Sequence, residues 1–205
     1  MMLAANNLVE SKTHIEAAYD LEPTNPEILG IMAAQFFREG DQQQAREYAS
    51  QSLALNPGEE SAIGVLVNVV GQESPEEALA IIERGAASSP ASVPIRLIKI
   101  QVLEVLGRTD DVIAVYQGLI AEFPEKHAYI KQLAQYYVSK FRADDAEAVL
   151  RETIAAQPES VELKMVLAQL LLASQGAESA MAELELMLAA EPANFEIRDA
   201  LGKLV

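Results

Sequence analysis

Residues 25–58 read NPEILGIMAAQFFREGDQQQAREYASQSLALNPG, and this stretch predicts a pair of helices. The Asn-Pro pair at 25–26 marks a helix start, because Asn caps free N–H groups and Pro fits the first turn. Apolar residues then recur at three- and four-residue spacing, as on one face of a helix. The Gly-Asp step at 40–41 ends that helix and begins a second, which the Asn-Pro-Gly at 56–58 ends. The stretch is therefore predicted to form a helical hairpin.

The same punctuation returns along the whole chain. Six prolines end successive segments at intervals of 33 or 34 residues, namely Pro23, Pro57, Pro90, Pro124, Pro158 and Pro192. A constant period of this length indicates stacked structural repeats. Twelve positions before five of these prolines stand small or aliphatic residues that would let two helices approach closely: Ala45, Ala78, Val112, Ala146 and Ala180. We therefore predict an all-α solenoid of stacked helix-turn-helix repeats.

Two stretches carry a local signal against this frame, and one helix start supports it. Residues 62–70 and 93–105 are rich in β-branched residues, which favour strands. The repeat frame runs through both, with one residue deleted between Val70 and Ala78, so we predict helices there. Ser74 and Glu77 have the spacing of a capping box at the start of the next helix.

This pattern resembles the tetratricopeptide repeat family, in which a helix-turn-helix of about 34 residues closes with a proline. The likeness covers the whole chain, and Ala-rich arrays of this kind are common in bacterial envelope and secretion machinery. It implies a right-handed superhelix whose first helices line a concave surface. The large aromatic residue usual early in each first helix is absent, and its place is taken by Leu29, Ile63, Arg96, Ile130 and Lys164. The small residue usual four positions later is Val67 and Ile100 in two units.

The frame divides the chain into a single array. We predict a partial repeat at 1–23, full repeats at 24–57, 58–90, 91–124, 125–158 and 159–192, and a terminal helix at 193–205. Because the frame begins inside a repeat and no second helix follows the last one, we expect a fragment of a longer repeat protein. The alternative is a complete small protein with one terminal capping helix.

Composition limits the partners. Acidic residues outnumber basic ones 31 to 15, for a net charge of −16. Nucleic acids and anionic lipids are bound through an excess of Lys and Arg, so we expect neither as a partner. No run approaches 18 apolar residues, and the start lacks the features of a signal peptide. We expect a soluble protein of the cytoplasm, or of the bacterial periplasm or envelope if it belongs to a longer secreted chain.

No motif points to catalysis. The chain has no cysteine, which excludes disulfides and thiolate chemistry. Its two histidines, His14 and His127, lie in different repeats without ligand-spaced neighbours and are interpreted as solvated. Pairs of carboxylates fall at predicted helix starts, where the helix dipole accounts for them: Glu76-Glu77, Asp110-Asp111 and Asp144-Asp145. We therefore predict no enzyme activity, no cofactor and no metal site.

The resemblance implies a binding groove on the first helices. One column of the groove carries a row of carboxamides that could bond the backbone of an extended peptide: Asn68, Gln101, Gln135 and Gln169. The alternative is that amides are merely tolerated on an exposed surface. Beside the row map one basic and several apolar side chains, which could bind a partner or be hidden by tight stacking: Phe37, Leu97, Lys131, Val138, Met165 and Leu172. The only basic residues near the groove are Arg38, Lys131 and Lys203, whereas chaperone-binding members of the resembled family grip a terminal carboxylate with several Lys, Arg and Asn, so we expect no such clamp.

These features predict a non-catalytic scaffold that binds a peptide segment or helix of a partner protein in its concave groove. Two alternatives stay open. The array could be a structural spacer that self-associates through its apolar faces or cut ends. It could also be the substrate-presenting arm of a larger multidomain enzyme.

Overall fold

The computed structural model describes residues 13–204, and every regular element within them is a helix. The chain forms two compact units, residues 1–115 and 116–205. The first begins, in its described part, with a helix over residues 13–21 and continues with α2 (Pro26–Glu39), α3 (Gln42–Leu55), α4 (Glu60–Val70), α5 (Pro75–Ser88) and α6 (Val93–Val105). The boundary falls inside α7 (Thr109–Glu122). The second unit holds α8 (His127–Ser139), α9 (Ala143–Ala156), α10 (Val161–Gln175), α11 (Ala177–Ala190) and α12 (Phe195–Gly202).

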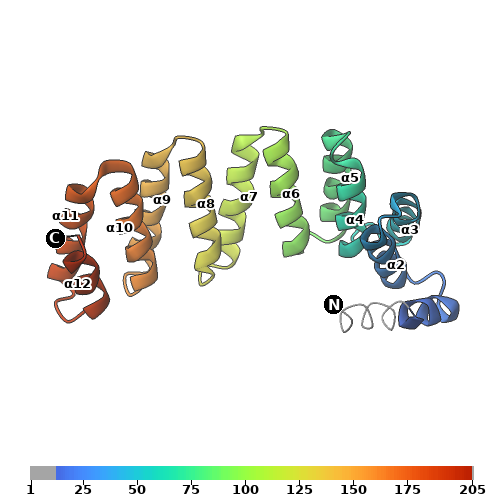
Figure 1. Ribbon diagram of the computed structural model, residues 1–205, viewed down its shortest axis with the longest axis horizontal. Coiled ribbons are helices and arrows are strands. Elements are labelled where there is room, and N and C mark those ends of the chain that lie inside the picture. The colour runs from blue at the N-terminus through green and yellow to red at the C-terminus, as the bar shows by residue number, and fades with distance from the viewer. Residues whose placement is uncertain (1–12, 205) are drawn as a thin grey trace. The chain divides into compact units, whose positions relative to one another are not determined.

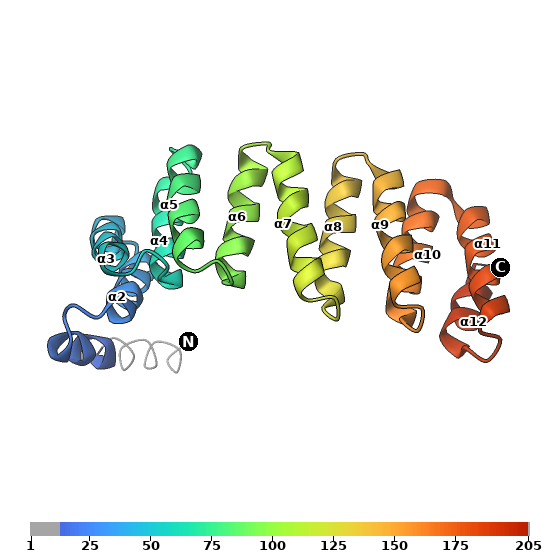
Figure 2. The same ribbon diagram turned by 180° about the vertical axis from the view of Figure 1, so that it is seen from behind.

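Within each unit, consecutive helices lie side by side (Figures 1 and 2). The prediction of an all-α repeat solenoid is thus confirmed for the described residues. Each predicted full repeat contains one pair of helices, beginning with α2 and α3 and ending with α10 and α11. The expectations for residues 1–12 lie outside the described part of the chain.

The two stretches rich in β-branched residues are helices, as the repeat frame predicted. They form α4 and α6. Most side chains of α4 are buried, including Ile63 and Val67. The small helix penalty of β-branched residues is outweighed by this burial, because each buried aliphatic side chain stabilises the fold by about 1.5–3 kcal/mol.

The helix ends follow the sequence signals with one exception. The Asn25 side chain caps α2 by accepting from the N–H groups of Glu27 and Ile28, and Gly40 ends α2 with φ at 84°, a conformation that favours glycine. Ser74 is the N-cap of α5, but its side chain makes no capping hydrogen bond. The predicted capping box is therefore wrong. The ψ of Ser74 is 71°, outside the extended region typical of an N-cap.

The column of small residues lies in the interior. All five members are fully buried, namely Ala45, Ala78, Val112, Ala146 and Ala180. A small side chain at these positions lets helices approach closely. Larger apolar side chains complete the core of each unit, among them Leu29, Ile82 and Leu103 in the first and Leu133, Leu150 and Leu167 in the second.

The column that lacks its aromatic residue is buried at every position except the half-buried Arg96. Leu29, Ile63 and Ile130 are each at most 2% exposed. Ile63 packs against Gly85 so closely that a Cβ on Gly85 would lie 2.3 Å from the Ile63 Cδ1 atom. Lys164 is also buried, and its ammonium group pairs with the Glu191 carboxylate. The departure from the family pattern is thus compatible with a packed helix pair.

Candidate partner-binding site

The predicted groove residues belong to both units. Four lie in the first unit and six in the second. The second unit contains Lys131, Gln135, Val138, Met165, Gln169 and Leu172.

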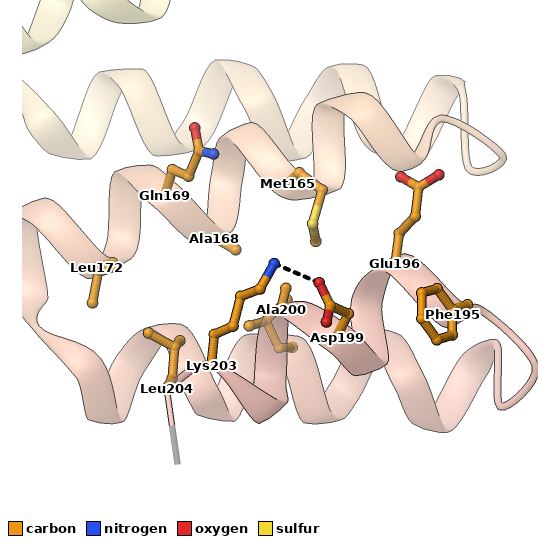
Figure 3. Close-up of a pocket in the computed structure, with 11 residues that line it drawn as sticks. Met165, Ala168, Gln169, Leu172, Phe195, Glu196, Asp199, Ala200, Lys203 and Leu204 are labelled. Carbon is orange, nitrogen blue, oxygen red and sulfur yellow. Dashed lines mark ion pairs between the residues drawn. The ribbon is translucent and has the colours of Figure 1, made fainter.

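In the second unit, these six residues line two hollows on the first helices. The hollow between α8 and α10 has a volume of about 450 Å³ and is lined by Lys131, Ala134, Gln135, Val138, Leu150, Val166, Gln169, Leu170 and Ala173. The hollow between α10 and α12 has a volume of about 480 Å³ and is lined by Met165, Ala168, Gln169, Leu172, Leu184, Phe195, Glu196, Asp199, Ala200, Lys203 and Leu204 (Figure 3). We call them the α8–α10 hollow and the α10–α12 hollow. Both involve Gln169, so they adjoin.

The two hollows are built from equivalent positions of successive repeats. Pairs of lining residues stand 34 positions apart, namely Lys131 and Met165, Gln135 and Gln169, Val138 and Leu172, Leu150 and Leu184, and Leu170 and Leu204. One floor residue of each hollow is a leucine of the following second helix, and both leucines are buried. The repeat period therefore produces a repeated concavity.

The hollows combine apolar walls with free amides. Val138 and Leu172 are 45% and 41% exposed, which leaves apolar surface open to solvent. The carboxamides of Gln135 and Gln169 are exposed and make no hydrogen bond to another described residue. Each amide can therefore donate hydrogen bonds to a bound molecule and accept hydrogen bonds from it. This combination suits a ligand with both apolar side chains and free backbone groups.

In the first unit, the four predicted residues lie on three first helices. Asn68 on α4 is exposed, but its side-chain nitrogen donates to the Gly64 carbonyl at 2.7 Å within its own helix. Gln101 on α6 is exposed, whereas Phe37 on α2 and Leu97 on α6 are half-buried. The two hollows described above include none of these four residues.

His127 is bound within the fold, so its interpretation as a solvated histidine is wrong. Its Nδ1 atom lies 2.8 Å from Oε2 of Glu162, and its Nε2 atom lies 2.8 Å from Oε1 of Gln157. The Gln157 side-chain nitrogen donates to the Pro124 carbonyl, which turns Oε1 toward the histidine. Because both ring nitrogens face acceptors, the geometry favours the imidazolium form.

The His127 cluster joins α8 to α10. Lys131 on α8 donates to the other Glu162 oxygen at 2.5 Å. The hydrogen bond that His127 donates to Glu162 raises the pKa of His127, and the hydrogen bonds that Glu162 accepts from Lys131 and His127 lower the pKa of Glu162. The 34-residue period does not reveal this cluster, because its members are not one full period apart. Glu162 lies 31 residues after Lys131 and 35 after His127.

Two classes of feature are not found in the described part of the chain. No group of three or more His, Asp or Glu side chains there is placed to hold a metal ion. Among the described helices, none combines the length and the apolar character needed to cross a bilayer.

The chain is similar to one protein family model and to several solved structures. Residues 137–204 match the family model described as tetratricopeptide repeat. PilW, described as a widely conserved type IV pilus biogenesis factor, is 17% identical, with a TM-score of 0.61 over 97% of this chain and 93% of that one. The pilF protein of Pseudomonas aeruginosa is 12% identical, with a TM-score of 0.62 over 98% and 92%. YrrB, described as a TPR protein with an unusual peptide-binding site, is 13% identical, with a TM-score of 0.55 over 91% and 96%.

At these identities the solved structures establish the fold of the chain. No curated protein matches the sequence. The family model covers α9 to α12, and the 34-residue period extends the same helical hairpins through the rest of the described chain. Residues 137–204 are therefore similar to the tetratricopeptide repeat family, and the other described repeats share the same helical hairpin.

Proposed function

We propose that the chain is a non-catalytic scaffold that holds an extended peptide segment of a partner protein on the face of its first helices. The fold is typical of protein–protein interaction scaffolds, in which stacked repeats present an extended surface. The observation that carries the proposal is the repetition of one hollow at a 34-residue interval, with a free carboxamide at each. A chain molecule can occupy successive equivalent sites, whereas a small ligand needs only one.

An extended segment suits these hollows better than a helix does. The backbone groups of a helix are already bonded to one another, whereas those of an extended chain are free. The carboxamides of Gln135 and Gln169 would pair with those free groups, and the apolar walls would take alternate side chains. The solved structure of YrrB supports this type of ligand, since that relative in fold has a peptide-binding site.

The proposal can be tested with selected peptides. Phage-displayed random peptides are selected on the purified chain, and enriched sequences are synthesised with a fluorescent label. We expect affinities of about micromolar Kd. The Gln135→Ala/Met165→Glu variant should bind at least about tenfold more weakly, because it loses a hydrogen bond and places a charge in an apolar wall.

The matched control is Gln117→Ala/Leu186→Glu. Both residues are exposed in the second unit, and neither lines a hollow. This variant should bind like the wild type. Selected peptides that bind the hollow variant and the wild type equally would show that the first-helix face is not the site. Light scattering checks that the wild type stays monomeric during the titration.

A further inference from the structure

Two equivalent carboxylates have opposite surroundings in the second unit. Glu162 on α10 accepts hydrogen bonds from His127 and Lys131 of the preceding first helix. Glu196 on α12 stands 34 residues later at the rim of the α10–α12 hollow. The positions equivalent to His127 and Lys131 hold Val161 and Met165 there. The cations that neutralise the first carboxylate are thus replaced by apolar side chains beside the second.

Glu196 has no ion pair with any other residue in the described part of the chain. Its side chain is exposed at the end of the hollow that Phe195 also occupies (Figure 3). The other charges that line the hollow neutralise each other, since Asp199 and Lys203 form an ion pair at 2.5 Å. The nearby cations are engaged elsewhere: Lys164 pairs with Glu191, and Arg198 donates to the Pro192 carbonyl. The rim therefore carries one uncompensated negative charge.

The rest of the hollow is suited to an apolar side chain. Met165 points from α10 toward α12, and Leu172 and Leu204 lie at the end away from Glu196 (Figure 3). The Phe195 ring is 73% exposed, so its face can also receive a cation. The hollow thus offers a place for positive charge at one end and a place for an aliphatic group at the other.

We propose that the α10–α12 hollow binds a partner segment in which Arg or Lys stands close to a bulky aliphatic residue. The cation would lie beside the Glu196 carboxylate, at the site that Lys131 and His127 fill beside Glu162. The aliphatic side chain would contact Met165, Leu172 and Leu204. This inference rests on the proposed function, because it names the chemistry of the segment held on the first helices.

Charge complementarity supports this occupant over an acidic or neutral one. The whole chain carries a net charge of −16, which attracts a basic segment and repels an acidic one. The α8–α10 hollow does not need a cation from the partner segment, because its own Lys131 already pairs with Glu162. The basic residue of the partner is therefore expected at the α12 end of the segment.

The test uses the selected peptides and two variants, each of which replaces one glutamate with the uncharged glutamine. Enriched sequences should contain Arg or Lys near Leu, Ile, Met or Phe. The best Arg-containing peptide should bind Glu196→Gln about threefold to fivefold more weakly than the wild type, as expected for an exposed ion pair. The control is Glu185→Gln, which removes an exposed carboxylate on α11 outside the hollow and should leave the affinity unchanged.

A second peptide, with citrulline in place of Arg, completes a double-mutant cycle. Citrulline keeps the shape of Arg without its charge, so Glu196→Gln should no longer alter its binding. Equal losses for Glu196→Gln and Glu185→Gln, or a Glu196→Gln effect that persists with citrulline, would overturn the inference. A different result would contradict the proposed function, namely peptide binding that survives Gln135→Ala/Met165→Glu.

Discussion

Residues 125–158 and 159–192 contain equivalent helix pairs, α8–α9 and α10–α11, that bury one position early in the first helix by different means. In the earlier pair this position is Ile130, which is 2% exposed. In the later pair it is Lys164, which is 7% exposed and pairs with Glu191. The residue equivalent to Glu191 in the earlier pair is Gln157. In these two pairs the cation and its carboxylate are thus present together or absent together.

This comparison shows which constraint the repeat imposes. The period requires a long side chain that fills the space between helices, and an aliphatic or a paired cationic side chain both satisfy it. A buried charge without a partner does not satisfy it, because desolvation costs several kcal/mol. The Lys164 ammonium group also lowers the pKa of Glu191. The partner lies 27 residues further along the chain, so the exchange is visible only when both positions are compared.

The largest expected effect lies at the position that the two pairs share. Ala146 and Ala180 are both fully buried. Asp at either position buries a charge and overfills a close helix contact, so Ala146→Asp and Ala180→Asp should each destabilise by about 3–5 kcal/mol. Urea unfolding monitored by circular dichroism measures this. A wild-type midpoint for Ala146→Asp would mean that the interior column is misassigned.

The next largest change in stability is expected when Ile130 and Lys164, the residues that differ between the two pairs, are each replaced by the type found in the other pair. Ile130→Lys places a cation where the equivalent partner is Gln157, and it should destabilise by about 2–3 kcal/mol, since the long Lys side chain can partly reach water. The reverse change, Lys164→Met, should alter stability by about 1 kcal/mol or less, because Glu191 is one-third exposed and can be solvated.

Adding the missing carboxylate is the control for this exchange. The Ile130→Lys/Gln157→Glu variant rebuilds the pair and should recover part of the lost stability in the same unfolding assay. Gln157 also bonds to His127 and to the Pro124 carbonyl, so Gln157→Glu alone is the reference for the double variant. An equal cost of Ile130→Lys in the wild type and in the Gln157→Glu background would show that pairing does not explain the difference between the repeats.

A smaller effect comes from the His127 cluster, which the later pair lacks. The folded-state pKa of His127 is raised above 6.5, so its stabilisation is complete below pH 6.5 and is lost as pH rises through the folded-state value. Glu162 has a folded-state pKa below 4.5, so its stabilisation is present above pH 4.5 and is lost as pH falls through that lower value. The cluster should therefore stabilise most between about pH 4.5 and 6.5.

His127→Gln tests this pH dependence. Between pH 6 and 8 the wild type should lose at most about 1 kcal/mol more stability than the variant, given that Glu162 is half-exposed. His14→Gln removes the other histidine, which is exposed in the first unit, and should keep the wild-type profile. Identical profiles for His127→Gln and the wild type would exclude the imidazolium assignment.

The smallest expected change in stability concerns Tyr136, whose equivalent in the later pair is Leu170. The Tyr136 hydroxyl is buried without a hydrogen-bond partner among the described residues. Tyr136→Phe removes that group and keeps the ring, so stability should stay equal or rise by up to about 1 kcal/mol. Thermal unfolding compares the two proteins. A clear loss of stability would show that the hydroxyl has a partner, such as a bound water molecule.

The amino-acid sequence was sufficient to predict the helices, their pairing and the buried column. These features depend on local patterns: the prolines at constant spacing, the Asn25 cap, the Gly40 break, and the apolar period of each helix. Even α4 and α6 could be predicted against their strand-forming composition, because the period constrains them more than local propensity does. The capping box at Ser74 failed because a cap depends on backbone angles that spacing alone does not determine.

The candidate site was predicted only in part. The exposed amides of Gln135 and Gln169 and the open walls at Val138 and Leu172 follow from helix periodicity, since residues on one helix face share an environment. The sequence did not predict the hollows between neighbouring first helices, because a concavity depends on the packing of side chains from three helices. It also did not single out Glu196, which has no cation beside it among residues 13–204, a difference that is evident only by comparison with the Glu162 cluster.

The sequence by itself determined that this chain is a stack of two-helix repeats, because the signals for that architecture repeat within 34 residues and act locally. Tertiary structure decided which polar groups meet across the repeats. The bond from His127 to Glu162, the burial of Lys164 against Glu191 and the free Glu196 carboxylate all depend on the stacking of successive repeats. Side-chain reach and helix packing control those contacts, and neither is encoded in the period of the sequence.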